Sequence, residues 1–286
     1  FWNEKLDTLS SDELFHLHQQ KFLKELEYVF GYSLFYQEKF RKNGVVLADV
    51  KGLEDLGNLP FTEKKELRDA QMSYPPVGIH RACSIEKLTR VYSSSGTTGI
   101  PTYIGLTAKD ISNVHAECIA RFCWAGGIRP DSVVINIPTA PFIADTFREG
   151  IEKTGAVNMP TGFNTDRVIS ALQYQKANAL HSTVSFWSYL LGEIEQKGID
   201  PKRLGLRTII GGAEGGTRLV RPRIEESFGA TVVEGMGMGE MACVIFGECV
   251  QNRGNGMHYI AQDVVHVELI DPESGKQIEI KEGAKG

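Results

Sequence analysis

The sequence has no apolar run that approaches the roughly 18 to 20 residues a membrane-spanning helix needs. It also has no excess of positive charge, because 31 Lys and Arg residues stand against 36 Asp and Glu residues, a formal net charge of -5. Neither a nucleic-acid backbone nor an anionic membrane surface is therefore an expected partner. Hydrophobic residues still make up 42% of the 286 residues, which is enough for a folded core.

Cysteine is scarce as well, with five residues that are odd in number and scattered along the chain. This usage is typical of a reducing compartment, and the N-terminus lacks a signal-peptide layout, so a cytoplasmic location is expected. The sequence begins with Phe1 rather than Met and stops at Gly286, directly after a strand-like segment. We therefore expect it to be a fragment.

Glycine is rare in one part of the chain, because only five of the thirty glycines precede residue 91. The later glycines cluster where a backbone turns tightly or where a ligand approaches the main chain. The clusters are Gly211, Gly212, Gly215 and Gly216, followed by Gly235, Gly237 and Gly239.

The patterning predicts an α/β fold with mostly parallel strands, divided into three parts. Residues 1–90 show helical spacing of apolar residues and predict a helical N-terminal lobe, with Thr62 placed to cap a helix. Residues 91–240 alternate strand-like and helical segments and predict the α/β core. Residues 241–286 predict a truncated β-rich part, with a hairpin between 264–270 and 277–280.

Individual elements can be assigned within this scheme. Thr107 and Asp110 form an Asp variant of a capping box, which predicts the start of a helix. His115 is expected to be a boundary histidine on that helix, between core and surface, and His266 is expected to face solvent. Strands are expected at 88–92, 103–106, 133–137, 156–159, 179–182, 208–210 and 231–234, and helices near 142–154, 166–176, 185–197 and 217–228.

The segment between the first two expected strands packs five hydroxyl residues and two glycines into residues 93–99. Hydroxyl donors and unobstructed backbone N–H groups are what phosphate groups require. The segment is not a Walker A loop, because it lacks the Gly-Lys-Ser/Thr ending and a strand follows it. A polar surface hairpin is the alternative on composition alone.

Residues 94–102, Ser-Ser-Gly-Thr-Thr-Gly-Ile-Pro-Thr, resemble the phosphate-loop signature of adenylate-forming enzymes. Further segments resemble the phenylacetate-CoA ligase family, in the order in which that family has them. These segments are Phe35-Tyr36, Asp55-Leu56, Leu59 to Lys64, Gly212-Ala213-Glu214, Glu234 to Glu240, Gly256-Met257-His258, Asp263 and Glu268 to Pro272. The resemblance implies the large N-terminal domain of such an enzyme, without its C-terminal lid domain.

The resemblance implies an AMP-forming carboxylate-CoA ligase, which uses ATP and Mg²⁺ to activate a small carboxylic acid and then passes the acyl group to CoA. Ser94, Ser95, Gly96, Thr97, Thr98 and Gly99 would hold phosphates, with Thr97, Thr98 and Glu240 as catalytic residues and Glu240 as the Mg²⁺ ligand. Gly212, Ala213, Glu214, Gly235, Met236, Gly237 and Met238 would contact the nucleotide. The catalytic lysine and the ribose-binding aspartate would follow Gly286, and a homodimer is a candidate assembly.

Three residues depart from the family pattern. Ile100 replaces the loop lysine, and Met236 and Gly239 replace a tyrosine and a hydroxyl residue. Two alternatives therefore stay open: an adenylating ligase that delivers the acyl group to a carrier protein or an amine, and a catalytically decayed nucleotide-binding homologue. Methionine can still pack on a purine face.

The segment that holds the aryl group in the family also differs here, so the acid is not fixed by the resemblance. The candidate acid-binding residues are Phe142, Ser185, Trp187 and Gly211, although aromatic residues at helix starts are also typical of core packing.

Cysteine and histidine spacing near the C-terminus raises the question of a metal site. Cys243, Cys249 and His258 offer zinc-type ligands, of which Cys249 and His258 are the better candidates. The alternative is a pair of buried cysteines and a histidine beside Asp263. Any zinc bound here would be structural, and its role would be separate from that of magnesium.

Overall fold

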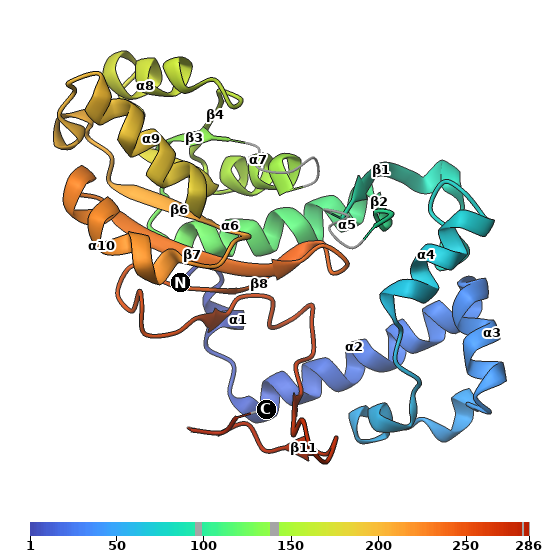
Figure 1. Cartoon of the computed structure of the whole chain (residues 1–286). Coiled ribbons are helices and arrows are strands. Elements are labelled where there is room, and N and C mark those ends of the chain that lie inside the picture. The colour runs from blue at the N-terminus through green and yellow to red at the C-terminus, as the bar shows by residue number, and fades with distance from the viewer. Residues whose placement is uncertain (95–98, 138–142, 282, 286) are drawn as a thin grey trace.

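The computed structural model describes residues 1–94, 99–137, 143–281 and 283–285, with only the backbone at 143–145. Helices dominate the N-terminal part, as the helical spacing predicted: α1 (Glu4–Asp7), α2 (Ser11–Tyr32), α3 (Leu34–Lys42) and α4 (Lys64–Ser73), with 3-10 turns η1 (Leu47–Asp49), η2 (Leu53–Asn58) and η3 (Ile85–Lys87). Figure 1 shows α2, α3 and α4 gathered on one side of the molecule, apart from the helices α7 to α10.

Within this part, α4 begins one residue later than Thr62 predicted. Glu63 is the N-cap residue, and its backbone N–H donates to Glu66 Oε2 at 2.7 Å. The Glu66 carboxylate also accepts from Lys39 Nζ, on the neighbouring helix α3, at 2.6 Å. The reciprocal contact between Glu63 and Glu66 fixes the start of the helix, so Thr62 is not its cap.

A separate antiparallel hairpin, β1 (Leu88–Ser93) and β2 (Tyr103–Thr107), leads into a helical stretch. The expected capping box is confirmed: Asp110 N–H donates to Thr107 Oγ1 at 3.2 Å, and Thr107 N–H donates to Asp110 Oδ2 at 2.8 Å. The stretch consists of α5 (Ala108–Asp110), a π-helical turn η4 (Ile111–His115) and α6 (Ala116–Ala125). His115 lies fully inside rather than at a boundary, with 1% of its surface exposed.

The central sheet has seven strands in the order β4-β3-β5-β6-β7-β8-β9. The first five are parallel, which confirms the α/β prediction: β4 (Val157–Pro160), β3 (Val133–Asn136), β5 (Ala179–Thr183), β6 (Thr208–Gly212) and β7 (Thr231–Met238). The antiparallel strands β8 (Cys243–Gly247) and β9 (His258–Tyr259) complete one edge. Because β7 and β8 pair directly, the expected division at residue 240 falls in the turn between two strands of one sheet.

Helices cover both faces of this sheet (Figure 1). Residues such as Leu180 and Ile209 pack against α8 (Thr165–Tyr174), α9 (Val184–Gln196) and α10 (Thr217–Phe228) on one face. Their neighbours Ala179 and Ile210 point to the other face, towards α6 and α7 (Ile143–Lys153). Strands buried on both faces explain why these segments read as continuous apolar runs in the sequence. The 3-10 turn η5 (Pro201–Leu204) joins α9 to β6.

The C-terminal hairpin is much shorter than the sequence predicted. Only β10 (Leu269–Ile270) and β11 (Gln277–Ile278) pair. The expectation of a strand from residue 264 is wrong, because Val264 N–H and Val265 N–H both donate to Ala261 O and the chain turns there. Val265 is buried by this turn in a cluster with Ala261 and Ile245.

The C-terminal segment packs against α2 of the N-terminal part. Lys21 Nζ donates to Asp263 O at 2.5 Å, and His18 Nδ1 lies 3.0 Å from His266 Nδ1. His266 is therefore half-buried rather than solvent-facing, which corrects the expectation from strand alternation. None of the helices in the described ranges combines the length and apolar character that crossing a membrane requires.

Candidate active site

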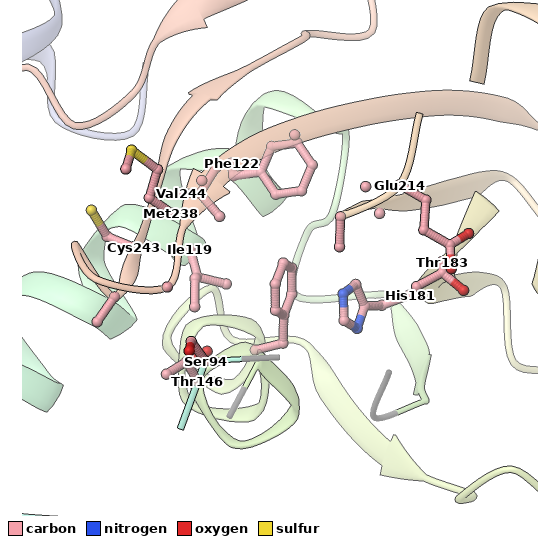
Figure 2. A pocket seen from close by; sticks show the side chains of 18 of the residues that line it. Ser94, Ile119, Phe122, Thr146, His181, Thr183, Glu214, Met238, Cys243 and Val244 are labelled. Atoms are coloured by element: carbon pink, nitrogen blue, oxygen red, sulfur yellow. The ribbon is translucent and has the colours of Figure 1, made fainter. Parts of the chain in front are cut away.

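A cavity of about 390 Å³ opens at the carboxyl ends of the parallel strands (Figure 2). Its walls come from the ends of β5 and β6, the β7–β8 hairpin, α6, α7 and the first residue of α4. This edge is where open parallel sheets bind ligands, because strand ends, loops and helix termini converge there. The position alone makes the cavity the candidate active site.

Two glycines in the strands shape the cavity wall. A Cβ at Gly211 would lie 1.8 Å from Ser182 O, and a Cβ at Gly235 would lie 2.8 Å from the Phe122 ring. Glycine is therefore required at Gly211 and Gly235 by the close packing of backbone and ring atoms within the protein, before any ligand is considered. A consequence of this packing is that bare main chain, rather than side chains, faces the cavity at both positions.

The turn after β6 is tied to the start of α9. Glu214 accepts hydrogen bonds from Ser185 N–H at 2.9 Å and from Ser185 Oγ at 3.0 Å. A carboxylate at a helix N-terminus is stabilised by the unpaired N–H groups and the helix dipole. The turn Gly212-Ala213-Glu214 is thereby held at the cavity, with Ala213 in the left-handed region at φ 66°.

An ion pair joins the β7–β8 turn to the N-terminal part. Lys64 Nζ lies 2.6 Å from Glu240 Oε1. Burial is the largest single effect and raises the pKa of Glu240, but the hydrogen bond from Lys64, a backbone hydrogen bond and the charges of Lys64 and Arg68 together lower the pKa below its ordinary value. Glu240 is thus an ionised carboxylate at neutral pH. Lys64 is the only Lys or Arg among the described residues that line the cavity.

The base of the Ser/Thr-rich loop is closed by hydrogen bonds between its two ends. Ser94 N–H donates to Thr102 O at 2.8 Å, and Thr102 N–H donates to Ser94 Oγ at 2.9 Å. Gln71, on α4, donates to Pro101 O at 2.5 Å and accepts from Tyr103 N–H at 2.9 Å. Helix α4 therefore contacts both the loop base and, through Lys64, the turn that carries Glu240.

One part of the cavity, which we call its floor, combines apolar side chains with one histidine. Ile119, Phe122 and Phe147 line it, and the His181 ring stacks on Phe147 with a centroid distance of 3.6 Å and an interplanar angle of 14°. His181 Nδ1 lies 2.8 Å from Asn136 Oδ1. Burial lowers the pKa of His181 to about 3, so the ring is neutral at physiological pH.

No family model matches the chain, but curated proteins do. Phenylacetate-coenzyme A ligases from Thermus thermophilus and Aromatoleum evansii are 31% and 33% identical to it, over 97% and 99% of this chain. The chain is thus similar to phenylacetate-coenzyme A ligases over nearly the whole of its own length. It spans 61% and 63% of the length of these two relatives.

Solved structures agree with this similarity. An open conformation of 2-hydroxyisobutyryl-CoA ligase, in complex with 2-HIB-AMP and CoA, superposes with a TM-score of 0.87 at 25% identity. The match covers 95% of this chain and 64% of that structure. ATP-bound MatB from Rhodopseudomonas palustris shares the fold alone, with a TM-score of 0.50 at 19% identity over 70% of this chain. The expected adenylate-forming α/β fold is thereby confirmed.

Nine of the described candidate site residues line this same cavity. They are Ser94, Gly211, Gly212, Ala213, Glu214, Gly235, Gly237, Met238 and Glu240. Ser95, Gly96, Thr97, Thr98 and Phe142 lie outside the described residues. Ser94 precedes the other segments by more than a hundred positions in the sequence, so their meeting is a property of the fold.

Four other candidates lie off the cavity wall. Gly99 and Met236 are not among the lining residues, and Met236 is half-exposed on β7. Ser185 lies in an adjoining hollow with Phe186 and Glu214. Trp187 is fully buried in the core, where its ring would be 2.7 Å from a Cβ at Gly211. Trp187 therefore packs behind the cavity wall at Gly211 and does not face the cavity.

The two better candidates for zinc ligands are adjacent: Cys249 Sγ lies 3.1 Å from His258 Nε2. Cys243 instead packs against Cys118 in a separate buried cluster. Among the described residues no group of three or more His, Cys, Asp or Glu side chains is placed to hold a metal ion. A structural zinc site uses four ligands, whereas Cys249 and His258 supply two, so zinc binding stays a prediction.

His181 and Lys64 were not singled out from the sequence. The expected strand 179–182 did carry a signal for His181, because it is apolar at its start and polar at its carboxyl end. Polar residues at that end of a parallel strand face the ligand edge of the sheet. Lys64 belonged to a family motif, but nothing local in the sequence predicts its pairing with a residue 176 positions away.

Proposed function

We propose that the full-length protein is an AMP-forming carboxylate-CoA ligase. The observation that carries this proposal is the convergence of three motif segments on one cavity: the loop base at Ser94, the turn Gly212-Ala213-Glu214 and the strand and turn from Gly235 to Glu240. The relatives named phenylacetate-coenzyme A ligases support the reaction class. The solved 2-hydroxyisobutyryl-CoA ligase, with an acyl adenylate and CoA bound, supports the two half-reactions.

In the first half-reaction a carboxylate oxygen of the acid attacks the α-phosphorus of ATP, and pyrophosphate leaves. In the second, the sulfur of CoA attacks the acyl carbon, AMP leaves, and the thiol proton goes to solvent. The acid is already ionised at neutral pH, so the first step needs no general base. The contribution of the cavity is positioning and stabilisation of charge on the phosphates.

The cavity residues divide between the parts of these substrates. The turn Gly212-Ala213-Glu214 and the bare main chain at Gly235 would hold the adenosine part. The Ser/Thr-rich loop, including Ser95, Gly96, Thr97 and Thr98, would hold the phosphates, with Lys64 near them. Phe122 and Phe147 offer an apolar surface to the acyl group.

Glu240 fits the expected magnesium site in its chemistry. It is an ionised carboxylate at the cavity, and Mg²⁺ is usually held by one or two carboxylates together with substrate phosphates and water. The ion would supply positive charge to the phosphate groups. A cytoplasmic location is part of the proposal, because the reaction consumes ATP and CoA and all five cysteines are free.

The decisive experiment measures acid-dependent exchange of labelled pyrophosphate into ATP by the full-length protein, followed by CoA-dependent AMP formation. Exchange together with CoA turnover supports the proposal. Exchange without CoA turnover overturns the CoA step in favour of a carrier-protein or amine acceptor. ATP binding without exchange for any acid overturns both and favours a decayed site, in line with Ile100, Met236 and Gly239.

A matched pair of variants ties the activity to this cavity. Glu240→Gln removes the carboxylate charge at the turn and is expected to lower the exchange rate at least tenfold. Glu226→Gln makes the same change at an exposed position of α10 and is expected to leave exchange unchanged. Equal rates in the two variants would contradict the role given to Glu240.

A further inference from the structure

His181 is an unusual residue for the floor of an acyl-binding cavity. It comes from the middle of β5, and only 2% of its surface is exposed. Its ring lies on Phe147, and the nearby wall at Ile119 and Phe122 is apolar. Figure 2 shows the imidazole reaching into the cavity from the side of Thr183 and Glu214. A purely apolar acyl group would be served better by another apolar side chain at this place.

The hydrogen bond to Asn136 decides which nitrogen carries the proton. Asn136 lies directly opposite His181 in the parallel pair β3–β5, with its Oδ1 2.8 Å from Nδ1. An amide oxygen only accepts, so Nδ1 donates its proton to it. In a neutral ring Nε2 then carries a lone pair and is an acceptor. The described residues supply no hydrogen-bond donor to Nε2.

An acceptor that stays unpaired inside a protein costs about 1–3 kcal/mol relative to a paired one. A bound molecule that fills the cavity and displaces water would therefore need a donor at this point. The carboxylate of the substrate cannot provide it, because an ionised carboxylate only accepts. The His181 ring lies on Phe147, which belongs to the surface proposed for the acyl group rather than to that proposed for adenosine, so we look for the donor on the rest of the acyl group.

We propose that His181 is a specificity-determining residue which selects carboxylic acids with a hydroxyl group on the acyl part, the hydroxyl donating a hydrogen bond to Nε2. This inference rests on the proposed ligase function and narrows its substrate class. The stack on Phe147 fixes the plane of the ring, and Asn136 fixes its tautomer, so the acceptor is held ready before the acid binds.

The test compares kcat/KM for acid-dependent pyrophosphate exchange between acids that differ by one hydroxyl. Suitable pairs are 2-hydroxyisobutyrate with isobutyrate, 3-hydroxybutyrate with butyrate, and 4-hydroxyphenylacetate with phenylacetate. A site built to bind a hydroxyl rejects the analogue that lacks it, so we expect at least one pair to favour the hydroxylated acid by about tenfold to a hundredfold. Equal values within every pair overturn the proposal, whatever the variants do.

His181→Phe keeps a ring on Phe147 but removes the acceptor. This variant is expected to lower kcat/KM for the preferred hydroxylated acid by about tenfold to a hundredfold. The kcat/KM for the acid of that pair without the hydroxyl should change less than threefold. His181→Gln, which retains an acceptor oxygen, should keep part of the preference and serves if the first variant does not fold. His115→Phe makes the same change at another buried histidine that does not line the cavity, and its preference should be that of the unaltered protein.

The outcomes separate this inference from the proposed function. Exchange with several acids but no preference for a hydroxyl overturns the role of His181 and leaves the ligase function standing. Absence of exchange with every acid overturns the ligase function, and the inference falls with it. A preference that survives in His181→Phe also contradicts the inference, because another residue would then bind the hydroxyl.

Discussion

At the scale of single residues, the pair Lys64–Glu240 links two features that the sequence left apart. The family's loop lysine is replaced by Ile100, which is half-exposed and carries no charge. Lys64 reaches the same cavity from α4 and lies 2.6 Å from Glu240. A cation at this place can neutralise a nucleotide phosphate as the loop lysine would. The cavity therefore still has a cation, although the loop has no lysine.

We predict that Lys64→Met weakens ATP binding about fivefold to twentyfold, because hydrogen bonds to charged groups contribute about 1.5 kcal/mol or more. The measurement is calorimetric titration of the full-length protein with ATP in the presence of Mg²⁺. Lys65→Met is the matched control, since Lys65 is the next residue on α4 but pairs with Asp69 in solvent. Equal dissociation constants for the two variants would show that Lys64 does not meet the nucleotide.

Residues of the candidate site could be predicted from the sequence where they belong to one short motif. Glu240 and the turn Gly212-Ala213-Glu214 were found because their neighbours in the chain complete a recognisable motif. His181 and Lys64 act through contacts with Asn136 and Glu240, which only the folded chain brings close. Pairings across strands and between lobes leave no periodic signal in the sequence.

At the scale of elements, the packing of β6 against β5 depends on one glycine. A Cβ added at Gly211 would lie 1.8 Å from the backbone O of Ser182. Real Cβ contacts are never so short, so any side chain there must push the two strands apart. The cavity wall is built from the same backbone atoms.

Gly211→Ala is therefore predicted to lower the free energy of unfolding by about 2 kcal/mol or more, as expected for a clash that rigid neighbours cannot relieve. Urea unfolding followed by circular dichroism measures this. Gly192→Ala is the control: Gly192 lies inside α9 with no atom near its virtual Cβ, so alanine should stabilise by about 0.5–1 kcal/mol. A loss of stability in both variants, or in neither, would contradict the packing argument.

The order of the elements was largely predictable, for a physical reason. Five parallel strands buried on both faces give apolar runs, and the helices between them give a 3.6-residue period. The exceptions lie at the ends of elements. The start of α4 was misplaced because a carboxylate contact between Glu63 and Glu66 fixes it. The hairpin was overextended because Val264 and Val265 turn to bond Ala261 instead of pairing.

At the scale of the whole molecule, burial of histidines couples stability to pH. Desolvation is the first cause in each case: it lowers the pKa of His115 to about 4 and that of His181 to about 3. The pKa of His80 and of His266 is lowered as well, for His266 by burial and then by the facing His18. All four folded pKa values lie below the unfolded value, so the folded state binds fewer protons than the unfolded state. Stability is then complete above about pH 6.5 and declines as the pH falls towards the folded pKa values.

We predict that the free energy of unfolding drops by about 4 kcal/mol between pH 7 and pH 5, since His115 and His181 each contribute about 2 kcal/mol over the 1.5 pH units below the unfolded pKa. Carboxyl groups with a lowered pKa, such as Glu240, also lose stabilising free energy as the pH falls, but mainly below about pH 4.5. Urea unfolding at half-unit pH steps gives the slope. His115→Gln should reduce the decline by about 2 kcal/mol, because glutamine does not titrate, whereas His16→Gln at an exposed position should reproduce the original slope. An unchanged slope in His115→Gln would mean that the buried histidine takes up its proton without opening the helix that holds it.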